Sequence, residues 1–484
     1  MPFNSYFFIF IFLPVTFCGY FVVNKFQNPK MAKLWMICAS LYFYSFFQIK
    51  NLPLLCLSIL TNFRITSLFH SNIGNLSKKW LLRFGLFFNL ILLGFFKYGD
   101  FAIGNFNWLF KANFDFLQLA LPLGISFFTL QQIAFLIDTY EGLNNKKSFL
   151  DYTFFVTFFP QLISGPIVKY AQLMPSLEKE SNRRINLQNV TLGIFLFCIG
   201  LVKKVILSNT FSTWASPGFD ESLSLDFLAA WKTSLSYTFQ LYFDFSGYTD
   251  MAIGIGYLFN FKLPQNFNSP LKSKSVIEFW TRWHMTLSQF ITTYVFTPIV
   301  RSMPKINFQT TMIATVMAMF ISGIWHGAGW TFILYGIFHG LALVINHVWK
   351  KKKRKLPPVL SWFMTFNFIN ITMVFFRAKD LDDALKVLRG MFGFDGFIIP
   401  KIGFKSVGFL KDFGFKIGPY LYPVDYLMIL FFILSFFLIH QTKNSLQLEK
   451  EIKINGKMGV LCGIAFVLSL FGMNKITEFI YFNF

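Results

Sequence analysis

The sequence predicts an all-α, polytopic integral membrane protein, and three observations support this fold class. Hydrophobic residues make up 55% of the 484 residues, whereas charged residues make up only 14%. The mean hydropathy is +0.52, and long apolar runs recur along the whole chain. A soluble domain of ordinary composition carries far more charge. A helix of about 20 mostly apolar residues, in contrast, can cross a bilayer.

The apolar runs define about 11 to 13 hydrophobic segments when each is compared with the length of a transmembrane helix. Several are too short to cross a bilayer alone, which favours short re-entrant or interfacial helices among the spans. The first run, residues 5–23, has no basic residue before it and is followed by further apolar runs. We therefore interpret it as a retained helix and not as a cleaved signal peptide.

Basic residues indicate the orientation of the chain. The formal net charge is +22, but the lysines and arginines are dispersed in short loops. The positive-inside rule and anionic membrane lipids explain this pattern better than binding to nucleic acid does. The strongest run, Lys350–Lys355, is therefore expected to be cytoplasmic. His326 then lies at or below the outer end of a helical hairpin formed by residues 310–324 and 330–349.

Three apolar segments contain Gly or Pro beside polar residues, namely residues 121–140, 158–170 and 240–256. We expect these segments to break inside the membrane. Freed backbone groups are tolerated there only where protein buries them or where they line a cavity. The sequence therefore predicts a polar interior.

Two histidines are the main candidates for chemistry. His326 lies in "SGIWHGAGWT", and an ionisable residue in a membrane segment suggests function because its burial is costly. The alternative is a hydrogen-bonded structural histidine at a helix turn. His284 lies in residues 278–296, whose apolar spacing predicts one amphipathic helix with its Trp residues at headgroup level. Its alternative is a buried, paired histidine. His339 is predicted to pack between helices.

Asp244 and Asp250 flank a Ser-Gly-Tyr string. They could orient a histidine or cap two broken helix ends, and we favour the structural role. The Walker, GxSxG and HExxH motifs do not occur, and the five dispersed cysteines lack the spacing of metal ligands, so no metal site is predicted. Histidines with buried hydroxyl and amide groups suit general base catalysis on a hydroxyl.

A set of ordered strings supplies a more specific signal, including "GFFKYGDF", "LPLGISFFTLQ", "FPQLISGPIVKY", "YFDFSGYTDMAIG", "EFWTRWHMTLSQF" and "GIWHGAGWTFILYGIFHG". Over residues 3–378 the sequence resembles the membrane-bound O-acyltransferases (MBOAT), within them the bacterial branch of alginate and peptidoglycan O-acetyltransferase membrane subunits. One string departs from the alginate type, because "FTPIVRSMPKINF" at residues 296–308 lacks its glycines.

The resemblance implies a ring of helices around a central funnel or tunnel, with two histidines near the reaction centre. His326 corresponds to the active-site histidine of the family and would act as the general base. His284 corresponds to the second family histidine and would position the acyl thioester or stabilise the oxyanion. Five further side chains would shape the channel or orient the histidines: Trp325, Trp330, Asn266, Asn268 and Asp244.

The expected reaction is transfer of an acetyl group from cytosolic acetyl-CoA to a hydroxyl of an envelope polysaccharide, or of a periplasmic SGNH-type partner enzyme. The expected location is the bacterial inner membrane, and no bound cofactor is expected. One alternative is D-alanyl transfer to teichoic acid. Another is an envelope-precursor transporter, since broken helices and intramembrane carboxylates are compatible with transport.

The composition divides the chain into three parts. Residues 1–378 are expected to form the acyltransferase core. Residues 379–423, which are richer in Gly, Lys and Asp, are expected to form a loop with short amphipathic pieces. Residues 424–484 are expected to add C-terminal transmembrane helices that complete a single domain.

Overall fold

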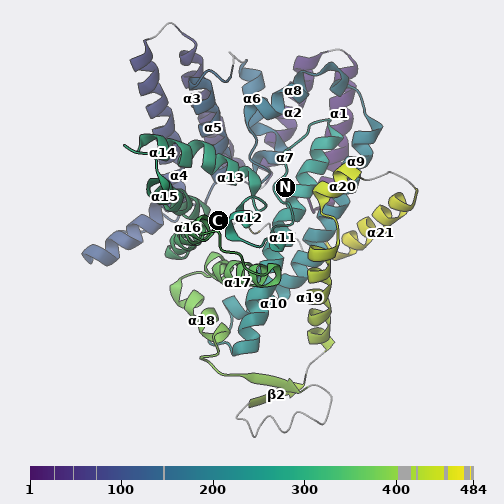
Figure 1. The fold of residues 1–484 in the computed structure, drawn as a ribbon. Helices are drawn as coiled ribbons and strands as arrows, with labels where there is room; N and C mark the ends of the chain where they lie inside the picture. The colour runs from purple at the N-terminus through teal and green to yellow at the C-terminus, as the bar shows by residue number, and fades with distance from the viewer. Residues whose placement is uncertain are drawn as a thin grey trace.

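The computed structural model describes residues 1–26, 28–46, 48–71, 74–144, 148–401, 416–420, 423–451, 456–473 and 480. Helices dominate these ranges (Figure 1). The helices before residue 225 are η1 (Phe8–Phe12), α1 (Leu13–Lys25), α2 (Pro29–Ser45), η2 (Ile49–Asn51), α3 (Leu52–Phe69), α4 (Asn75–Phe110), α5 (Ile125–Tyr140), α6 (Phe149–Thr157), α7 (Phe159–Leu162), α8 (Tyr170–Glu178), η3 (Glu180–Arg183), α9 (Leu187–Val202), η4 (Lys203–Ser208) and α10 (Asn209–Asp220).

The second half of the chain continues the pattern with shorter helices around residues 270–302. Its elements are α11 (Phe227–Leu258), η5 (Pro270–Lys272), α12 (Val276–Trp280), α13 (Met285–Ile291), η6 (Thr292–Phe296), α14 (Thr297–Ser302), α15 (Phe308–His326), α16 (Trp330–Lys351), α17 (Pro358–Arg377), α18 (Leu381–Met391), β1 (Ile398–Lys401), β2 (Lys416–Tyr420), α19 (Pro423–Gln441), α20 (Ser445–Glu451) and α21 (Gly456–Gly472). The two strands pair in parallel, with Ile398 opposite Lys416.

Seven helical stretches of the described chain are long and apolar enough to cross a membrane, and they confirm a polytopic, almost entirely helical fold. They are Phe8–Lys25, Ile49–Phe69, Asn75–Phe110, Leu187–Asp220, Phe308–His326, Trp330–Lys351 and Pro358–Arg377. Two shorter apolar helices, Asp425–Gln441 and Gly459–Gly472, follow near the C-terminus. The expected mixture of full spans and shorter apolar helices is therefore present.

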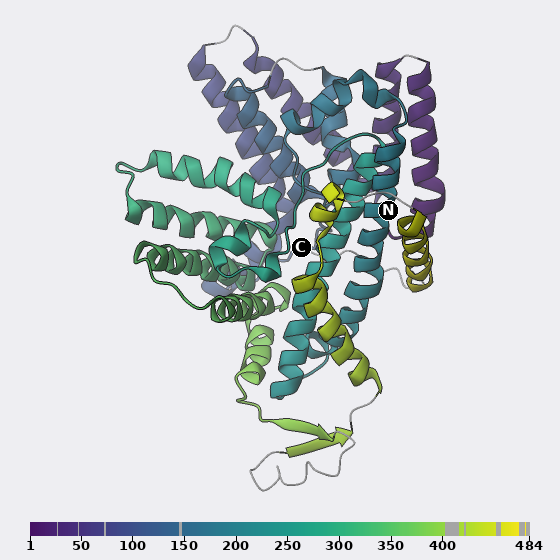
Figure 2. The same cartoon turned by 45° about the vertical axis from the view of Figure 1, so that its right-hand side comes forward.

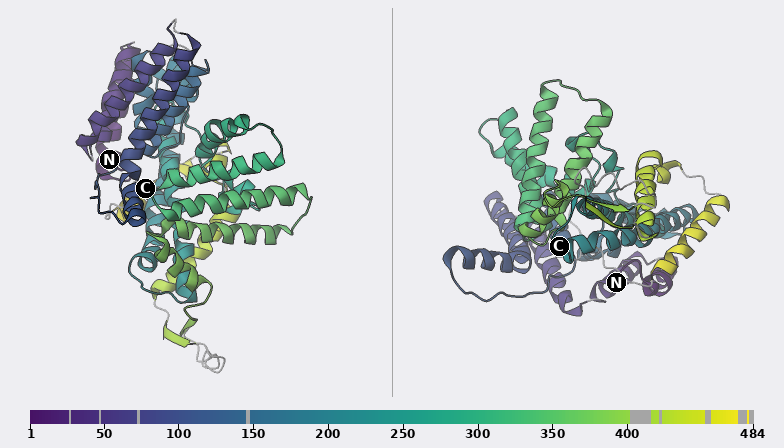
Figure 3. Two further views of the ribbon diagram at one scale, coloured as in Figure 1. Left: turned by 90° about the vertical axis from the view of Figure 1, so that its left-hand side faces the viewer. Right: turned by 90° about the horizontal axis from the view of Figure 1, so that it is seen from below.

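The helices run in two directions. Helices α1–α3, α5, α9 and α11 form a bundle along the long axis of the molecule, whereas α14, α15 and α16 run across it (Figures 2 and 3). The strands β1 and β2 lie at the lower end, below α10 and α18 (Figure 1). Because the two sets of helices meet, the end of α15 is brought into the interior of the bundle.

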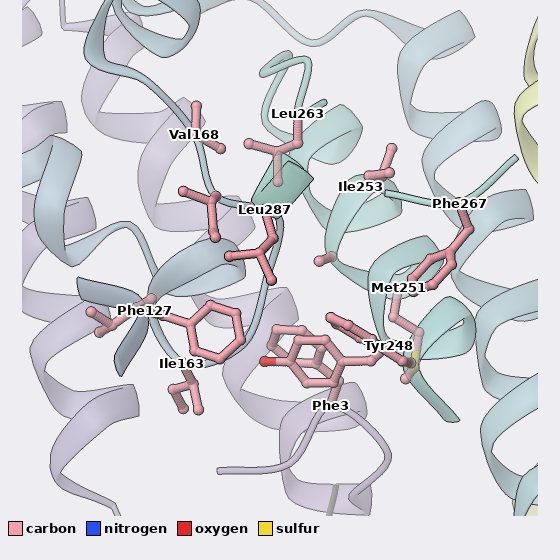
Figure 4. Packing of buried hydrophobic residues seen from close by; sticks show 14 of the residues in the cluster. Phe3, Phe127, Ile163, Val168, Tyr248, Met251, Ile253, Leu263, Phe267 and Leu287 are labelled. Carbon is pink, nitrogen blue, oxygen red and sulfur yellow. The ribbon is translucent and has the colours of Figure 1, made fainter. Parts of the chain in front are cut away.

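Aromatic side chains fill the interior where these sets meet. Phe3 stacks on Tyr248 of α11 with ring centroids 4.8 Å apart. Figure 4 shows Phe127 of α5 and Leu287 of α13 near the same packed region. Both are buried, with 5% and 0% of their surface exposed. Burial of large aromatic side chains dominates the packing energy of such a core.

One of the three predicted helix breaks is present. The chain leaves helical structure between Leu162 and Tyr170. In residues 121–140, α5 begins after Gly124, which has a φ of 71°, and continues unbroken to Tyr140. The predicted break at residues 240–256 is wrong, because α11 is continuous from Phe227 to Leu258. Its start is capped by Asp226, which accepts hydrogen bonds from the amides of Leu228 and Ala229 at 3.0 and 3.3 Å. The interior glycines of α11 are therefore used for close packing and not for a break.

Helices α15 and α16 form the predicted hairpin. Asn307 and Thr310 cap α15 reciprocally, because each side chain accepts a hydrogen bond from the amide of the other. Gly336 lets the two helices approach closely, since a Cβ atom there would lie 2.5 Å from the carbonyl oxygen of Met319. This contact orients the end of α15 relative to α16.

The region after α17 contains the amphipathic helix α18, which buries Ala384, Val387 and Met391 against the rest of the protein. Strands β1 and β2 were not expected from the sequence. Residues 402–415, in the middle of the predicted loop, lie outside the described residues. The division of the chain into three parts stays a prediction.

Candidate active site

His326 is the last residue of α15, and only 2% of it is exposed. The helix ends there because Gly327 has extended backbone angles (φ −165°, ψ 159°). A side chain at position 327 would also collide with Phe332, since a Cβ atom would lie 2.1 Å from its ring. The Gly-Ala-Gly string therefore forms a tight turn that buries the histidine between α15 and α16.

Aromatic rings surround the imidazole of His326. Its ring centroid lies 4.9 Å from that of Trp325, 5.0 Å from that of Phe376 and 5.9 Å from that of Tyr335. These rings come from α15, α17 and α16. The imidazole is therefore held in an apolar cage contributed by three spans.

His284 is completely buried and lies between α12 and α13. Its backbone is left-handed, with φ 43° and ψ 53°, a conformation that costs energy for a residue with a side chain. The prediction of one amphipathic helix over residues 278–296 is therefore wrong, because the helix is interrupted at this histidine. The Trp residues also do not share a headgroup position, since Trp283 is 2% exposed and stacks on Phe279 at 5.5 Å.

The indole ring of Trp325 lies next to both histidines. Its ring centroid lies 4.9 Å from that of His326 and 6.2 Å from that of His284. Phe127 of α5 packs on the same indole at 5.5 Å. The residues selected from the sequence as a catalytic pair are thus neighbours of one buried indole.

The side chain of Asn266, which the sequence analysis selected to orient a histidine, contacts His284. Its Oδ1 atom lies 3.3 Å from Nδ1 of His284 and accepts hydrogen bonds from the amide and hydroxyl of Thr286, at 3.2 and 2.7 Å. Because Oδ1 can only accept, Nδ1 of His284 must be the protonated nitrogen of this contact. In the neutral imidazole, the lone pair then lies on Nε2.

Lys97 and Tyr98 of α4 also belong to this site, and the sequence analysis did not select them. The ammonium of Lys97 donates to the carbonyl oxygens of Trp325 and His326, at 2.5 and 3.1 Å, and to the hydroxyl of Ser126 at 3.2 Å. The hydroxyl of Tyr98 donates to the carbonyl oxygen of Ile324 at 2.7 Å. The available signal was a lysine near the middle of an apolar helix of 36 residues.

Two cavities border the segment around His326. One of about 290 Å³ is lined by Gly327 and Ala328, by Lys97 and Asp100 of α4, and by Phe332. The other, of about 520 Å³, is lined by apolar and hydroxyl side chains, mainly of α12, α13, η6 and α15, among them Met285 and Ser322. Met285 follows His284, and Ser322 lies one helical turn before His326. Both cavities thus reach the immediate neighbours of the histidine pair.

Three selected residues make side-chain hydrogen bonds or ion pairs with partners other than the two histidines. Asp244 is buried in an ion pair with Lys204 and accepts a hydrogen bond from the amide of Ile480 at 2.9 Å. Asn268 accepts a side-chain hydrogen bond from Asn444 at 2.9 Å. Trp330 is 53% exposed, and its indole donates to Asn105 at 3.0 Å.

The remaining histidine and acidic candidates have structural surroundings. His339 is buried, accepts a hydrogen bond from the indole of Trp280 at 3.2 Å and contacts the hydroxyl of Thr372 at 3.1 Å. This agrees with its predicted packing role. Asp250 pairs with Lys203 at 2.6 Å. Neither carboxylate of α11 caps a broken helix, because α11 does not break.

Comparisons with known proteins identify the family of the chain. The model of the MBOAT, membrane-bound O-acyltransferase family, matches residues 145–377, which include both histidines. The chain is 44% identical to a peptidoglycan O-acetyltransferase of Helicobacter pylori over 100% of this chain and 97% of that protein. It is 32% identical to a probable alginate O-acetylase of Pseudomonas aeruginosa over 92% of this chain and 82% of that protein. It is 29% identical to a teichoic acid D-alanyltransferase of Bacillus subtilis, over 53% of this chain and 69% of that protein.

Proposed function

Because the chain belongs to the membrane-bound O-acyltransferase family and is a multi-pass O-acyltransferase, we propose that it moves an acetyl group from cytosolic acetyl-CoA to an envelope polysaccharide. We place it in a bacterial inner membrane, with peptidoglycan as the polymer. The observation that carries this proposal is the pair of buried histidines on one indole, at 4.9 and 6.2 Å. The full-length similarity to a peptidoglycan O-acetyltransferase supports the choice of polymer.

In the proposed mechanism, His326 is the general base. Its neutral imidazole takes the proton of the acceptor hydroxyl, and the oxygen attacks the thioester carbonyl carbon. The tetrahedral intermediate then collapses, the C–S bond breaks, and the departing thiolate takes the proton back from His326. A new ester on the acceptor and free coenzyme A result. The aromatic cage around His326 keeps water away from the thioester.

We assign His284 to positioning of the acyl thioester. A neutral His284 that donates from Nδ1 to Asn266 has no second N–H with which to stabilise an oxyanion. Positioning is therefore favoured over the oxyanion role for this side chain. The cavity beside Met285 and Ser322 offers a route for the donor, and the cavity beside Gly327 and Ala328 offers a route for the acceptor. The second route lies at the predicted outer end of the hairpin.

The acceptor can be the glycan or a hydroxyl on a periplasmic SGNH-type partner that then modifies the glycan. We favour the partner, because nearly all described elements of this chain are helices of a membrane protein. The purified chain, reconstituted in liposomes with acetyl-CoA and glycan, separates the two routes. Full glycan acetylation by the chain alone would remove the need for a partner.

The proposal is tested by mass spectrometry of envelope glycans from a deletion strain, complemented with wild-type or His326→Ala protein at matched membrane levels. Loss of the acetyl mass increment in the deletion, with restoration by wild type alone, is the expected result. An unchanged glycan in the deletion strain would contradict the assigned substrate. Full restoration by His326→Ala would contradict the assigned base.

D-alanyl transfer to teichoic acid is the second candidate, because D-alanyltransferases match part of the chain at 29–30% identity. Those matches cover only 53% of this chain, whereas the O-acetyltransferase match covers all of it. We therefore prefer acetyl transfer. The same deletion strain distinguishes the two reactions, since loss of D-alanine esters with unchanged acetyl content would favour the second.

A further inference from the structure

The last turn of α15 depends on side chains from another helix. A helix leaves its final carbonyl groups without partners in the helix itself. In α15 the chain after His326 is extended, so it does not form the left-handed glycine cap that closes many helices, and the amide of Gly327 donates one hydrogen bond, to the carbonyl oxygen of Ile324 at 3.2 Å. Tyr98 of α4 adds a second hydrogen bond to the carbonyl oxygen of Ile324, and Lys97 of α4 donates to those of Trp325 and His326.

Electrostatic attraction also favours the position of the Lys97 ammonium beside this turn. In the part of the chain that the structure describes, no ion pair joins the ammonium of Lys97 to a carboxylate. The negative end of the α15 dipole is its counter-charge, and the face of the Trp325 indole lies 5.7 Å from Nζ. The position of the ammonium and the position of the turn are therefore coupled.

The imidazole of His326 follows the backbone of this turn. His326 is the terminal helical residue, so no further helical turn holds it from the C-terminal side. Helix ends without partners fray. A displacement of a reacting group by about 1 Å can cost roughly 10²-fold in rate. The groups that hydrogen-bond to the carbonyl oxygens of Trp325 and His326 therefore determine the position of the His326 imidazole.

We propose that Lys97 is a positioning residue for acyl transfer, whose ammonium holds the backbone of Trp325 and His326 so that the His326 imidazole faces the acceptor hydroxyl. This inference rests on the proposed function in one respect, the assignment of His326 as the base. In this proposal Lys97 acts through the backbone of the turn and is assigned no contact with a reacting atom. Tyr98 assists by holding the preceding carbonyl, and Ser126 anchors the ammonium from α5.

The test compares Lys97→Met, Lys97→Arg and Ser126→Ala in the full chain, in membrane vesicles at matched protein levels. Lys79→Met is the matched control, because Lys79 is an exposed lysine on the same helix. We expect Lys97→Met to lower kcat by roughly 10²-fold while KM for acetyl-CoA stays near the wild-type value. Lys97→Arg should restore part of the rate, and Ser126→Ala, which keeps the charge, should lower kcat several-fold.

A second measurement does not depend on the reaction. Diethylpyrocarbonate modifies accessible imidazoles, and peptide mass spectrometry reports each histidine separately. Lys97→Met should raise modification of His326 but not of His339, which its own hydrogen bonds to Trp280 and Thr372 hold in place. If wild type transfers no acetyl group, the proposed function fails while this readout still decides the role of Lys97.

Three results would overturn the proposal. The first is a wild-type kcat for Lys97→Met, with unchanged modification of His326. The second is a raised KM with unchanged kcat, which would indicate substrate binding. The third is equal exposure of His326 and His339, which would indicate general unfolding in Lys97→Met. If Lys97→Met does not accumulate in the membrane, Ser126→Ala decides, and a wild-type kcat in that variant would overturn the proposal.

Discussion

Two groups of buried polar side chains in this protein have different partners. The ion-pair cluster consists of Lys203, Lys204, Asp244 and Asp250, at the contact of η4 with α11. The histidine site consists of His284, His326, Trp325 and Lys97. In the ion-pair cluster each charge faces an opposite charge, and Ser445 adds a hydrogen bond to Asp250 at 2.6 Å. In the histidine site the imidazoles lie among aromatic rings, and the ammonium contacts carbonyl oxygens.

This difference predicts that the ion-pair cluster contributes to stability, whereas the histidine site contributes to the reaction. A buried ion pair removes the cost of two isolated charges, and loss of one partner restores that cost for the other. A neutral imidazole among aromatic rings carries no charge that a partner must balance, so its replacement leaves no isolated charge behind, while its ring nitrogen can accept a proton during the reaction. We therefore expect variants of the histidine site to lose rate with an intact fold. Variants of the ion-pair cluster should lose stability while each folded molecule keeps its rate.

The largest expected effect is that of His326→Gln. Glutamine retains a polar side chain of similar size but cannot act as a base at neutral pH. We expect acetyl transfer to fall by roughly 10²–10⁴-fold, with unchanged thermal stability in detergent. His347→Gln, in the same hairpin but half-buried near the basic run, serves as the control and should keep the wild-type rate. If His326→Gln loses thermal stability, and this loss accounts for its lower rate, His326 is a structural histidine like His339.

The next effect concerns stability and comes from the ion-pair cluster. Asp244→Asn removes the carboxylate that pairs with Lys204, whose side chain is only 3% exposed. Breaking such a pair costs about 3–5 kcal/mol. We expect less protein in the membrane and a lower unfolding temperature in detergent, with a normal rate per folded molecule.

The double variant Lys204→Met/Asp244→Leu tests whether this ion pair contributes to stability alone. Replacing both charges by apolar groups should recover most of the lost stability. Recovery of stability without any acetyl transfer would contradict the structural assignment, since it would show that the carboxylate takes part in the reaction.

A smaller effect is expected at Asn266, which links the histidine site to the loop after α11. Asn266→Leu removes the acceptor for Nδ1 of His284 and for Thr286. Loss of such an orienting partner typically costs roughly 10–100-fold in activity. Asn266→Asp keeps an acceptor oxygen and should retain more of the rate than Asn266→Leu. Steady-state kinetics on membrane vesicles measure both, and equal rates for the two variants would exclude the orienting role.

The contrast between these regions also shows what could be predicted from sequence. Composition and the length of apolar runs predicted a polytopic helical protein, because hydropathy acts over whole helices. His326 and His284 could be selected because histidine is rare in such segments and because ordered strings resembled a family. The hairpin of α15 and α16 followed from a Gly-rich turn between two apolar runs.

The predictions that were wrong, and the residue that was missed, also have physical explanations. The break expected in α11 does not occur because helices from elsewhere in the chain pack on its glycines: a Cβ atom on Gly247 would lie 2.7 Å from the carbonyl oxygen of Gly200. The left-handed backbone of His284 could not be predicted from apolar spacing, since Asn266, which is distant in sequence, contacts the imidazole of His284 and accepts a hydrogen bond from the amide of Thr286. Lys97 was missed because its partners are backbone carbonyls, which no sequence motif specifies.

The smallest expected effect is at Trp330, which the sequence selected as a channel residue. The structure leaves 53% of Trp330 exposed and gives its indole a hydrogen bond to Asn105 at 3.0 Å. Trp330→Phe removes that hydrogen bond, which is worth about 1 kcal/mol, and keeps an aromatic ring against Phe101. The rate of acetyl transfer should therefore stay within about twofold of wild type, because no contact of Trp330 reaches either imidazole in the described structure. Trp325→Phe, measured in parallel, alters the indole between the two histidines and should lower the rate far more. A similar loss in both variants would extend the histidine site to the start of α16, and would show that the channel includes the exposed indole as well as the buried one.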